Sequence, residues 1–224
     1  MKTGITELVF ILDRSGSMNG LESDTIGGFN SMIDRQKKED SKVYVTTVLF
    51  DDELVFIHER CPIERVTKLT KEVYFARGCT ALLDAIGISI EKTAEALKKM
   101  PNNEKADKVI FVIITDGLEN SSEEFTYRNV KSLIEARKKC GWEFLFLGAN
   151  IDAGREAEKI GIARNRSVTY ENDAKGVAIN YATVGKTIIK ATVSENSTIT
   201  FDENWADEIE EYHKEKTTSK LEEW

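Results

Sequence analysis

The sequence predicts an α/β fold, in which a doubly wound, mainly parallel central sheet has helices on both faces and one antiparallel edge strand. Three observations support this: continuous apolar runs that stop at polar turns, helical apolar periods between these runs, and a globular composition. The chain has 224 residues, of which 41% are hydrophobic and 31% charged, with only two prolines. This length suits one α/β domain with a short appendage.

Continuous apolar runs are typical of strands that are buried on both faces of a parallel sheet. Each run in this chain stops at a polar or glycine turn. The predicted strands are residues 8–12 before Asp13, 109–114 before Thr115, 144–147 before Gly148, and a shorter one at 167–170.

Apolar residues recur at three- and four-residue spacing between these strands, as they do in amphipathic helices. A short helix is also expected at residues 153–160. The apolar stripes of the longer helices are Ile26, Phe29 and Ile33; Leu83, Ile86, Ile90, Ala94 and Leu97; Tyr127, Val130 and Ile134; and Val177, Tyr181, Val184 and Ile188.

Residues 43–50 and 54–58 flank the link Asp51-Asp52-Glu53. This link is too short for a crossover connection, so the two segments form an antiparallel hairpin. We expect the hairpin at one edge of the sheet.

Residues 193–224 differ from the predicted domain of residues 1–192, because they are acidic and aromatic and form a helical extension. Phe201, Trp205, Ile209 and Tyr212 are spaced for one face of a helix, and residues 200–203 have the form of a capping box. Packing of this face on the domain, docking of a partner, and a loosely held tail all remain open.

Charge and segment composition exclude several classes of protein. The 31 basic and 39 acidic side chains give a net charge of −8, which disfavours nucleic acid and anionic membranes. The N-terminus lacks the pattern of a signal peptide, and no apolar stretch approaches the roughly 20 residues of a membrane span. Cys61, Cys79 and Cys140 have neither CxxC nor Cys/His ligand spacing. We therefore expect a cytoplasmic protein without a disulfide scaffold or a zinc site.

Oxygen-bearing side chains stand at three loops that the predicted fold brings to one end of the sheet. Asp13, Ser15 and Ser17 directly follow the first strand, Thr80 precedes a helix, and Asp116 ends another buried strand. Ligands of open α/β sheets bind in the crevice at the carboxyl ends of the strands. Hard oxygen ligands suit Mg²⁺, so these five residues are the candidate metal ligands.

The pattern Asp-x-Ser-x-Ser, a later Thr before a helix, and Thr-Asp-Gly after a strand resembles the metal-ion-dependent adhesion site (MIDAS) of von Willebrand factor type A (vWA) domains. The order of elements from residue 6 to about 189 is also similar to that family, in particular to stand-alone domains of bacterial type. The family commonly has Gly-Gly-Thr where this chain has Gly78-Cys79-Thr80, so the backbone of this loop is expected to be less free.

The resemblance implies that the hydroxyls of Ser15, Ser17 and Thr80 hold Mg²⁺, with Asp13 and Asp116 often behind them; Mn²⁺ or Ca²⁺ are also possible. A metal held mostly by neutral hydroxyls keeps much of its positive charge. The family resemblance therefore implies a protein-binding module, not an enzyme, that captures an Asp or Glu of a partner protein.

Two other functions remain as alternatives. The first, by analogy with the family, is an adaptor subunit of a larger assembly, either a stress-response assembly or an assembly linked to an ATPase or kinase. A Mg²⁺-dependent phosphohydrolase is less favoured. If Asp13 were the nucleophile of such an enzyme, a second carboxylate would be needed as its acid/base partner at the position of Ser15, and the sequence contains no phosphate-binding glycine loop. Only His58 and His213 are available as histidine bases, and neither follows a central strand.

Three nearby carboxylates have two interpretations each. Asp84, four residues after Thr80, either assists the site through hydrogen bonds or is a solvated helix residue. Asp51 and Asp52 either lie at the rim of the metal site or only shape the hairpin turn.

Overall fold

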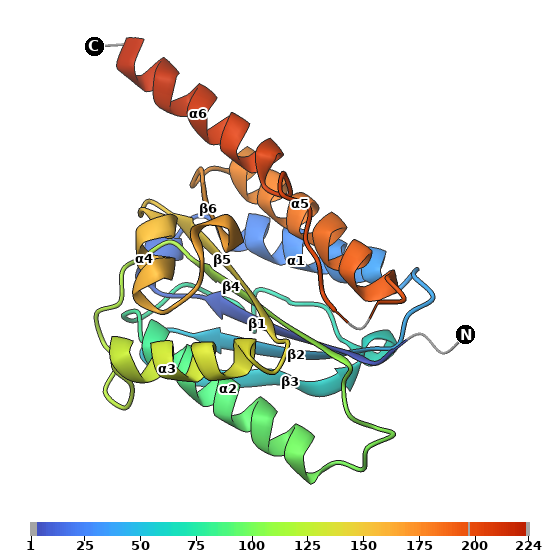
Figure 1. The fold of residues 1–224 in the computed structure, drawn as a ribbon. Coiled ribbons are helices and arrows are strands. Elements are labelled where there is room, and N and C mark those ends of the chain that lie inside the picture. The colour runs from blue at the N-terminus through green and yellow to red at the C-terminus, as the bar shows by residue number, and fades with distance from the viewer. Residues whose placement is uncertain (1–3, 197, 223–224) are drawn as a thin grey trace.

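The computed structural model describes residues 4–196 and 198–222, and its centre is a six-stranded sheet of order β3-β2-β1-β4-β5-β6 (Figure 1). Neighbouring strands are parallel except for the antiparallel pair β2–β3 at one edge. The predicted fold class and the edge hairpin are thereby confirmed. The strands are β1 (Thr6–Asp13), β2 (Val43–Phe50), β3 (Leu54–Pro62), β4 (Lys108–Thr115), β5 (Glu143–Ala149) and β6 (Ser167–Tyr170).

Helices cover both faces of this sheet, as Figure 1 shows. α1 and α5 pack together over one face, while α2, α3 and α4 lie over the other. α6 lies beyond α5, and its far end projects from the body of the molecule (Figure 1). The helices are α1 (Glu22–Gln36), α2 (Leu82–Lys99), α3 (Tyr127–Lys138), α4 (Ala153–Lys159), α5 (Ala174–Val193) and α6 (Asp207–Glu222).

The central strand β1 shows why the apolar runs are continuous. Leu8, Phe10 and Leu12 point into the hydrophobic cluster under α1 and α5, while Val9 and Ile11 point into the cluster under α2 and α3. Successive side chains of a strand point to opposite faces, so a strand between two helical layers needs apolar residues at every position.

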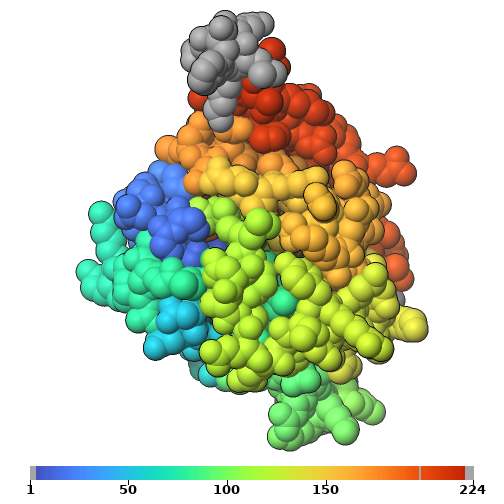
Figure 2. Space-filling model, turned by 90° about the vertical axis from the view of Figure 1, so that its left-hand side faces the viewer, coloured from blue at the N-terminus to red at the C-terminus, as the bar shows by residue number. Residues whose placement is uncertain are grey.

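The carboxyl ends of the parallel strands all lie at the same end of the sheet, and Figure 2 shows the molecule from this end. The segment after β1 (blue), the segment before α2 (teal) and the segment after β4 (yellow-green) lie side by side there. The predicted site residues stand on these three segments.

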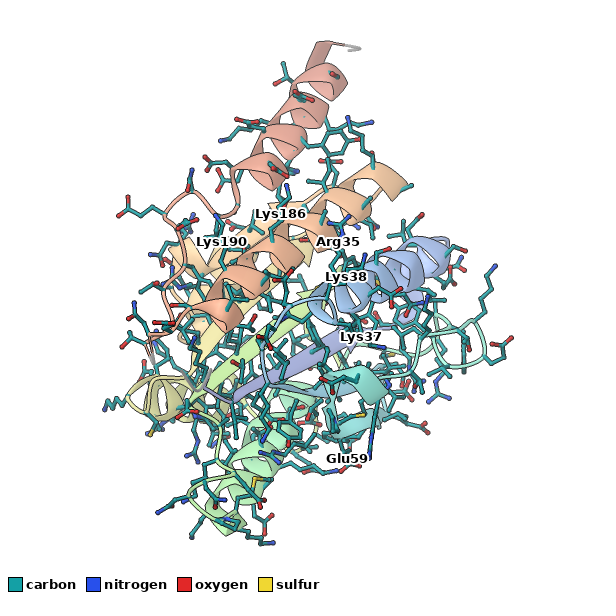
Figure 3. The ribbon with its side chains drawn as sticks, turned by 90° about the vertical axis from the view of Figure 1, so that its right-hand side faces the viewer. Arg35, Lys37, Lys38, Glu59, Lys186 and Lys190 are labelled. Atoms are coloured by element: carbon teal, nitrogen blue, oxygen red, sulfur yellow. The ribbon has the colours of Figure 1, made fainter. Side chains whose placement is uncertain are left out.

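The C-terminal segment packs on α5 and β6. Phe201, Trp205, Ile209 and Tyr212 are all buried, and the indole nitrogen of Trp205 donates a hydrogen bond to the carbonyl of Asn165 over 2.9 Å. Two ion pairs, Lys186–Glu208 and Lys190–Asp202, connect the segment to α5; Figure 3 labels both lysines.

The expectation of one helix from residue 200 was wrong, because residues 200–206 are not helical and α6 begins at Asp207. Phe201 and Trp205 both enter the core cluster from this irregular stretch. Tertiary packing of the two aromatic side chains overrides the local capping signal.

Among the described residues, no helix is long and apolar enough to cross a membrane.

Candidate metal site

Asp13 ends β1 and is only 1% exposed. Its carboxylate accepts two hydrogen bonds, from the backbone N–H of Ser15 (2.7 Å) and from the hydroxyl of Thr115 (2.5 Å). The hydroxyl of Tyr74, which is fully buried, donates to the carbonyl oxygen of Asp13 over 2.5 Å. Asp13 therefore fixes the start of the loop that carries both serines.

The two serine hydroxyls lie next to each other, and the hydroxyl of Ser17 contacts Asp116. The Oγ atoms of Ser15 and Ser17 are 3.0 Å apart, and Ser17 Oγ donates to Oδ1 of Asp116 over 2.5 Å. A short 3-10 turn over Gly16–Met18 brings Ser17 back toward Ser15. The structure thus places these hydroxyls in front of the Asp116 carboxylate.

Backbone hydrogen bonds join the Thr80 loop to the other two loops. The N–H of Thr80 donates to the side-chain oxygen of Asn120 (2.8 Å), and the N–H of Asn120 donates to the carbonyl of Thr80 (3.1 Å). On the other side, the N–H of Gly16 donates to the carbonyl of Gly78 over 3.1 Å. The five predicted residues are therefore brought together by contacts between segments that are far apart in the sequence.

The residues present fit a divalent cation. A Cβ atom at Gly117 would lie 3.3 Å from Thr80 Oγ1 and 3.4 Å from Ser17 Oγ, so the glycine keeps the space between these hydroxyls open. Oδ2 of Asp116 is buried and has no hydrogen-bond partner within the described part of the chain. An unpaired buried carboxylate oxygen beside open hydroxyls is the arrangement that a hard cation or its bound water satisfies.

Both carboxylates of the site are costly to keep charged. Burial raises the pKa of Asp13 to about 6, although the hydrogen bonds from Thr115 and Ser15 oppose the shift. Burial also raises the pKa of Asp116, against the hydrogen bond from Ser17. A nearby positive charge would offset this cost.

Residues 4–196 and 198–222 contain no group of three or more His, Cys, Asp or Glu side chains that could hold a metal ion, so a cation at this site would also need the hydroxyl oxygens as ligands. Cys61, Cys79 and Cys140 are all free thiols.

Three supporting residues were not predicted: Tyr74, Thr115 and Asn120. Thr115 stands next to Asp116 in the Thr-Asp-Gly motif, which is a signal that sequence analysis could have used. Asn120 contacts Thr80 across forty positions of the chain, and no local pattern indicates such a contact.

Asp84 acts on the loop after β4. Its carboxylate accepts hydrogen bonds from the backbone N–H groups of Glu123, Glu124 and Phe125, at 2.8, 3.0 and 2.7 Å. It is 8% exposed, so the solvated-residue interpretation was wrong. Asp84 assists the site only indirectly, by ordering the segment that begins with Asp116.

The hairpin turn lies at the same end of the sheet as the site, but Asp51 faces two arginines. Its Oδ2 is 2.7 Å from Nε of Arg14 and 2.7 Å from Nε of Arg77. Burial acts to raise the pKa of Asp51, but the hydrogen bonds from Arg77 and the Glu53 backbone and the charges of both arginines outweigh it, so the pKa is lowered. Asp51 therefore ties the hairpin to the neighbouring loops.

The backbone of the Thr80 loop requires a glycine at position 78 but not at position 79. Its φ of +66° is in the left-handed region, whereas Cys79 is not among the described non-glycine residues with positive φ. A Cβ at Gly78 would also lie 1.7 Å from Oδ1 of Asp52. The glycine is required at position 78, and the exposed Cys79 has ordinary backbone geometry.

A Gly78→Ala variant is expected to bind a divalent cation about tenfold more weakly and to lose about 1–2 kcal/mol of unfolding free energy, because of backbone strain and the clash with Asp52. Calorimetric titration and urea denaturation measure the two effects. Gly27→Ala is the matched control: a Cβ there meets no atom of the described residues within 4 Å, so it should leave metal affinity unchanged and slightly increase stability. Equal behaviour of the two variants would contradict the role of Gly78.

Solved structures of other proteins share this fold. The vWF domain of the type V pili tip protein Mfa5 from Porphyromonas gingivalis superposes with a TM-score of 0.62 at 10% identity, covering 87% of this chain and 98% of that one. Proximal thread matrix protein 1 from the mussel byssus, solved with a zinc-occupied MIDAS motif, has a TM-score of 0.55 at 17% identity, covering 84% of this chain.

This chain spans only 46% of the mussel protein's length. The ArnB paralog VWA2 from Sulfolobus acidocaldarius has a TM-score of 0.50 at 17% identity and covers 84% of this chain and 45% of that one. No protein-family model and no curated protein sequence matches the chain. The structural likeness nevertheless identifies the architecture: the chain has the von Willebrand factor type A fold.

Proposed function

We propose that the chain is a metal-dependent protein-binding module. Asp13, Ser15, Ser17, Thr80 and Asp116 hold a divalent cation, and the module captures an Asp or Glu side chain of a partner protein. Mg²⁺ is the proposed cation because all the donors are hard oxygens and Mg²⁺ is abundant; Mn²⁺ and Ca²⁺ suit the same donors. The bound cation supplies the positive charge that attracts the partner's carboxylate.

The convergence of hydroxyls in front of buried carboxylates carries this proposal. Ser17 Oγ lies 3.0 Å from Ser15 Oγ and 2.5 Å from Asp116 Oδ1, while Asp116 Oδ2 has no hydrogen-bond partner among the described residues. Ser17 is exposed, so the open side of the arrangement faces solvent and is accessible to a partner. The zinc-occupied MIDAS of the mussel protein supports a divalent metal in this fold.

We also propose that the site binds without catalysing a reaction. Neither histidine is hydrogen-bonded to Ser15 or Ser17: His58 lies between the hydroxyls of Thr47 and Thr67, and His213 contacts Glu171. The serines therefore have no histidine to act as a general base. The free cysteines support a reducing, cytoplasmic setting.

Calorimetric titration of Mg²⁺ and Mn²⁺ into metal-free protein tests the proposal. Wild-type protein should show saturable binding, and Asp116→Ala should lower the affinity at least about a hundredfold, because the buried carboxylate that faces Ser17 is lost. Asp40→Ala is the control, since Asp40 is exposed and lies in the loop before β2, at the opposite end of the sheet. Unchanged affinity in a folded Asp116→Ala variant would refute the site.

A further inference from the structure

Exposed apolar side chains stand on the loops that carry the candidate metal site. Among the side chains that the structure describes, the exposed large apolar ones are Val55, Val73, Phe75, Leu118 and Val193. Three of these lie in the loops that build the site: Val73 (37% exposed), Phe75 (43%) and Leu118 (53%). We refer to these three residues as the apolar rim.

The position of Tyr74 determines where two rim residues lie. Its ring is fully buried and its hydroxyl donates to the carbonyl of Asp13, so residue 74 points into the protein at the end of β1. Its neighbours Val73 and Phe75 are turned outward. The Phe75 ring lies 5.6 Å from the guanidinium carbon of Arg14, which is the residue between Asp13 and Ser15.

Leu118 reaches the site from the β4 side. It directly follows Gly117, the residue at which a Cβ would touch the Thr80 and Ser17 hydroxyls. The three segments that carry the rim and the hydroxyls lie together on the face of the molecule that Figure 2 shows. Apolar side chains that gather at a polar site mark a surface on which another molecule docks.

The charges next to the site restrict the partner. A groove of about 620 Å³ runs beside Cys79 and Ala81 and is lined by the carboxylates of Asp52, Glu123 and Glu124. These carboxylates repel any further acidic group that a partner brings to the site. The acidic first turn of α6 from a second copy, with Asp207, Glu208 and Glu210, is therefore a poor occupant.

We propose that the occupant is a segment of a partner protein in which a single Asp or Glu is flanked by bulky apolar side chains. This inference rests on the proposed function: the acidic side chain goes to the metal, and its apolar neighbours pack on Phe75 and Leu118. The apolar rim supplies selectivity that the metal alone lacks, because a cation attracts every carboxylate.

Two synthetic peptides test this inference, acetyl-Gly-Leu-Glu-Phe-Gly-amide and acetyl-Gly-Ser-Glu-Ser-Gly-amide, titrated into wild-type protein with saturating Mg²⁺. The apolar peptide should bind about tenfold more tightly, because it removes apolar surface from water. The preference should disappear in the double variant Phe75→Ser/Leu118→Ser and persist in Val193→Ser, which changes another exposed apolar residue, at the end of α5. Mg²⁺ affinity should be the same in all three proteins.

Equal binding of both peptides to the wild type would overturn the role of the apolar rim and leave carboxylate capture intact. Bound Mg²⁺ with no binding of either peptide would overturn carboxylate capture itself, and with it this inference. Sedimentation of the protein with and without Mg²⁺ tests the other occupant: Mg²⁺-dependent self-association would show that a second copy binds there and would also overturn the proposal.

Discussion

Asp13→Asn is expected to bind Mg²⁺ at least about a hundredfold more weakly than the wild type, yet to be more stable without metal at pH 8. The buried carboxylate has its pKa raised from an ordinary value of 3.8 to about 6. The folded state therefore binds this proton more tightly than the unfolded state, and the free energy of unfolding falls as pH rises from about 4 to about 6. Asparagine does not titrate, so the Asp13→Asn variant avoids this loss of unfolding free energy.

The amide keeps the shape of the carboxylate. Its oxygen accepts from the Ser15 N–H, and the Thr115 hydroxyl can rotate to accept from its nitrogen. We expect a gain of about 2 kcal/mol at pH 8, and little gain at pH 4, where the carboxyl group is largely protonated in the folded state. Urea denaturation with a chelator at both pH values measures this.

Asp40→Asn, at an exposed position, is the control and should change neither stability nor metal affinity. A metal-free Asp13→Asn protein that is less stable than the wild type at pH 8 would show that the hydrogen bonds of the carboxylate outweigh the cost of its burial. Stability and metal binding would then not oppose each other at this residue.

Trp205→Ala is expected to lower the free energy of unfolding by about 3–5 kcal/mol, as large-to-small core substitutions do. The indole is 7% exposed, belongs to the core cluster under α1 and α5, and donates to the carbonyl of Asn165. Asn165 precedes β6, at the end of the sheet opposite to the metal site. Mg²⁺ affinity of the folded variant should therefore be unchanged.

Lys190→Ala provides the comparison within the same contact region. It removes an ion pair with Asp202 in which both side chains are mostly exposed, so it should change stability little. If Trp205→Ala proved as mild as Lys190→Ala, the segment after α5 would be only loosely held, and the partner-docking interpretation of its aromatic residues would become the better one.

Most of the sheet could be predicted because its strands have a strong local signal. The runs at residues 8–12, 109–114 and 144–147 are apolar at every position, and the structure extends each of them by a few residues into β1, β4 and β5. Segments whose conformation depends on distant packing were harder to predict. Residues 200–206 carry a local capping pattern, yet Phe201 and Trp205 hold them in an irregular path.

The candidate ligands were named from sequence by family resemblance and by their places after strands. Their mutual distances depend on contacts that no local pattern encodes. Asn120 positions Thr80, and Asp84 orders the segment after Asp116. Asp51, next to the predicted site in space, pairs with Arg14 and Arg77 instead of facing the hydroxyls.

The sequence by itself determined the layered α/β architecture and the residue types at the carboxyl ends of the strands, because periodicity and turn chemistry are local properties. Only the tertiary structure decided that Asp116 Oδ2 is buried with no partner in the described part of the chain, that Asp13 is buried enough to raise its pKa, and that Phe75 and Leu118 stay exposed beside the site. Burial and charge are properties of the surroundings of a side chain, and those surroundings are assembled from segments that only folding brings together.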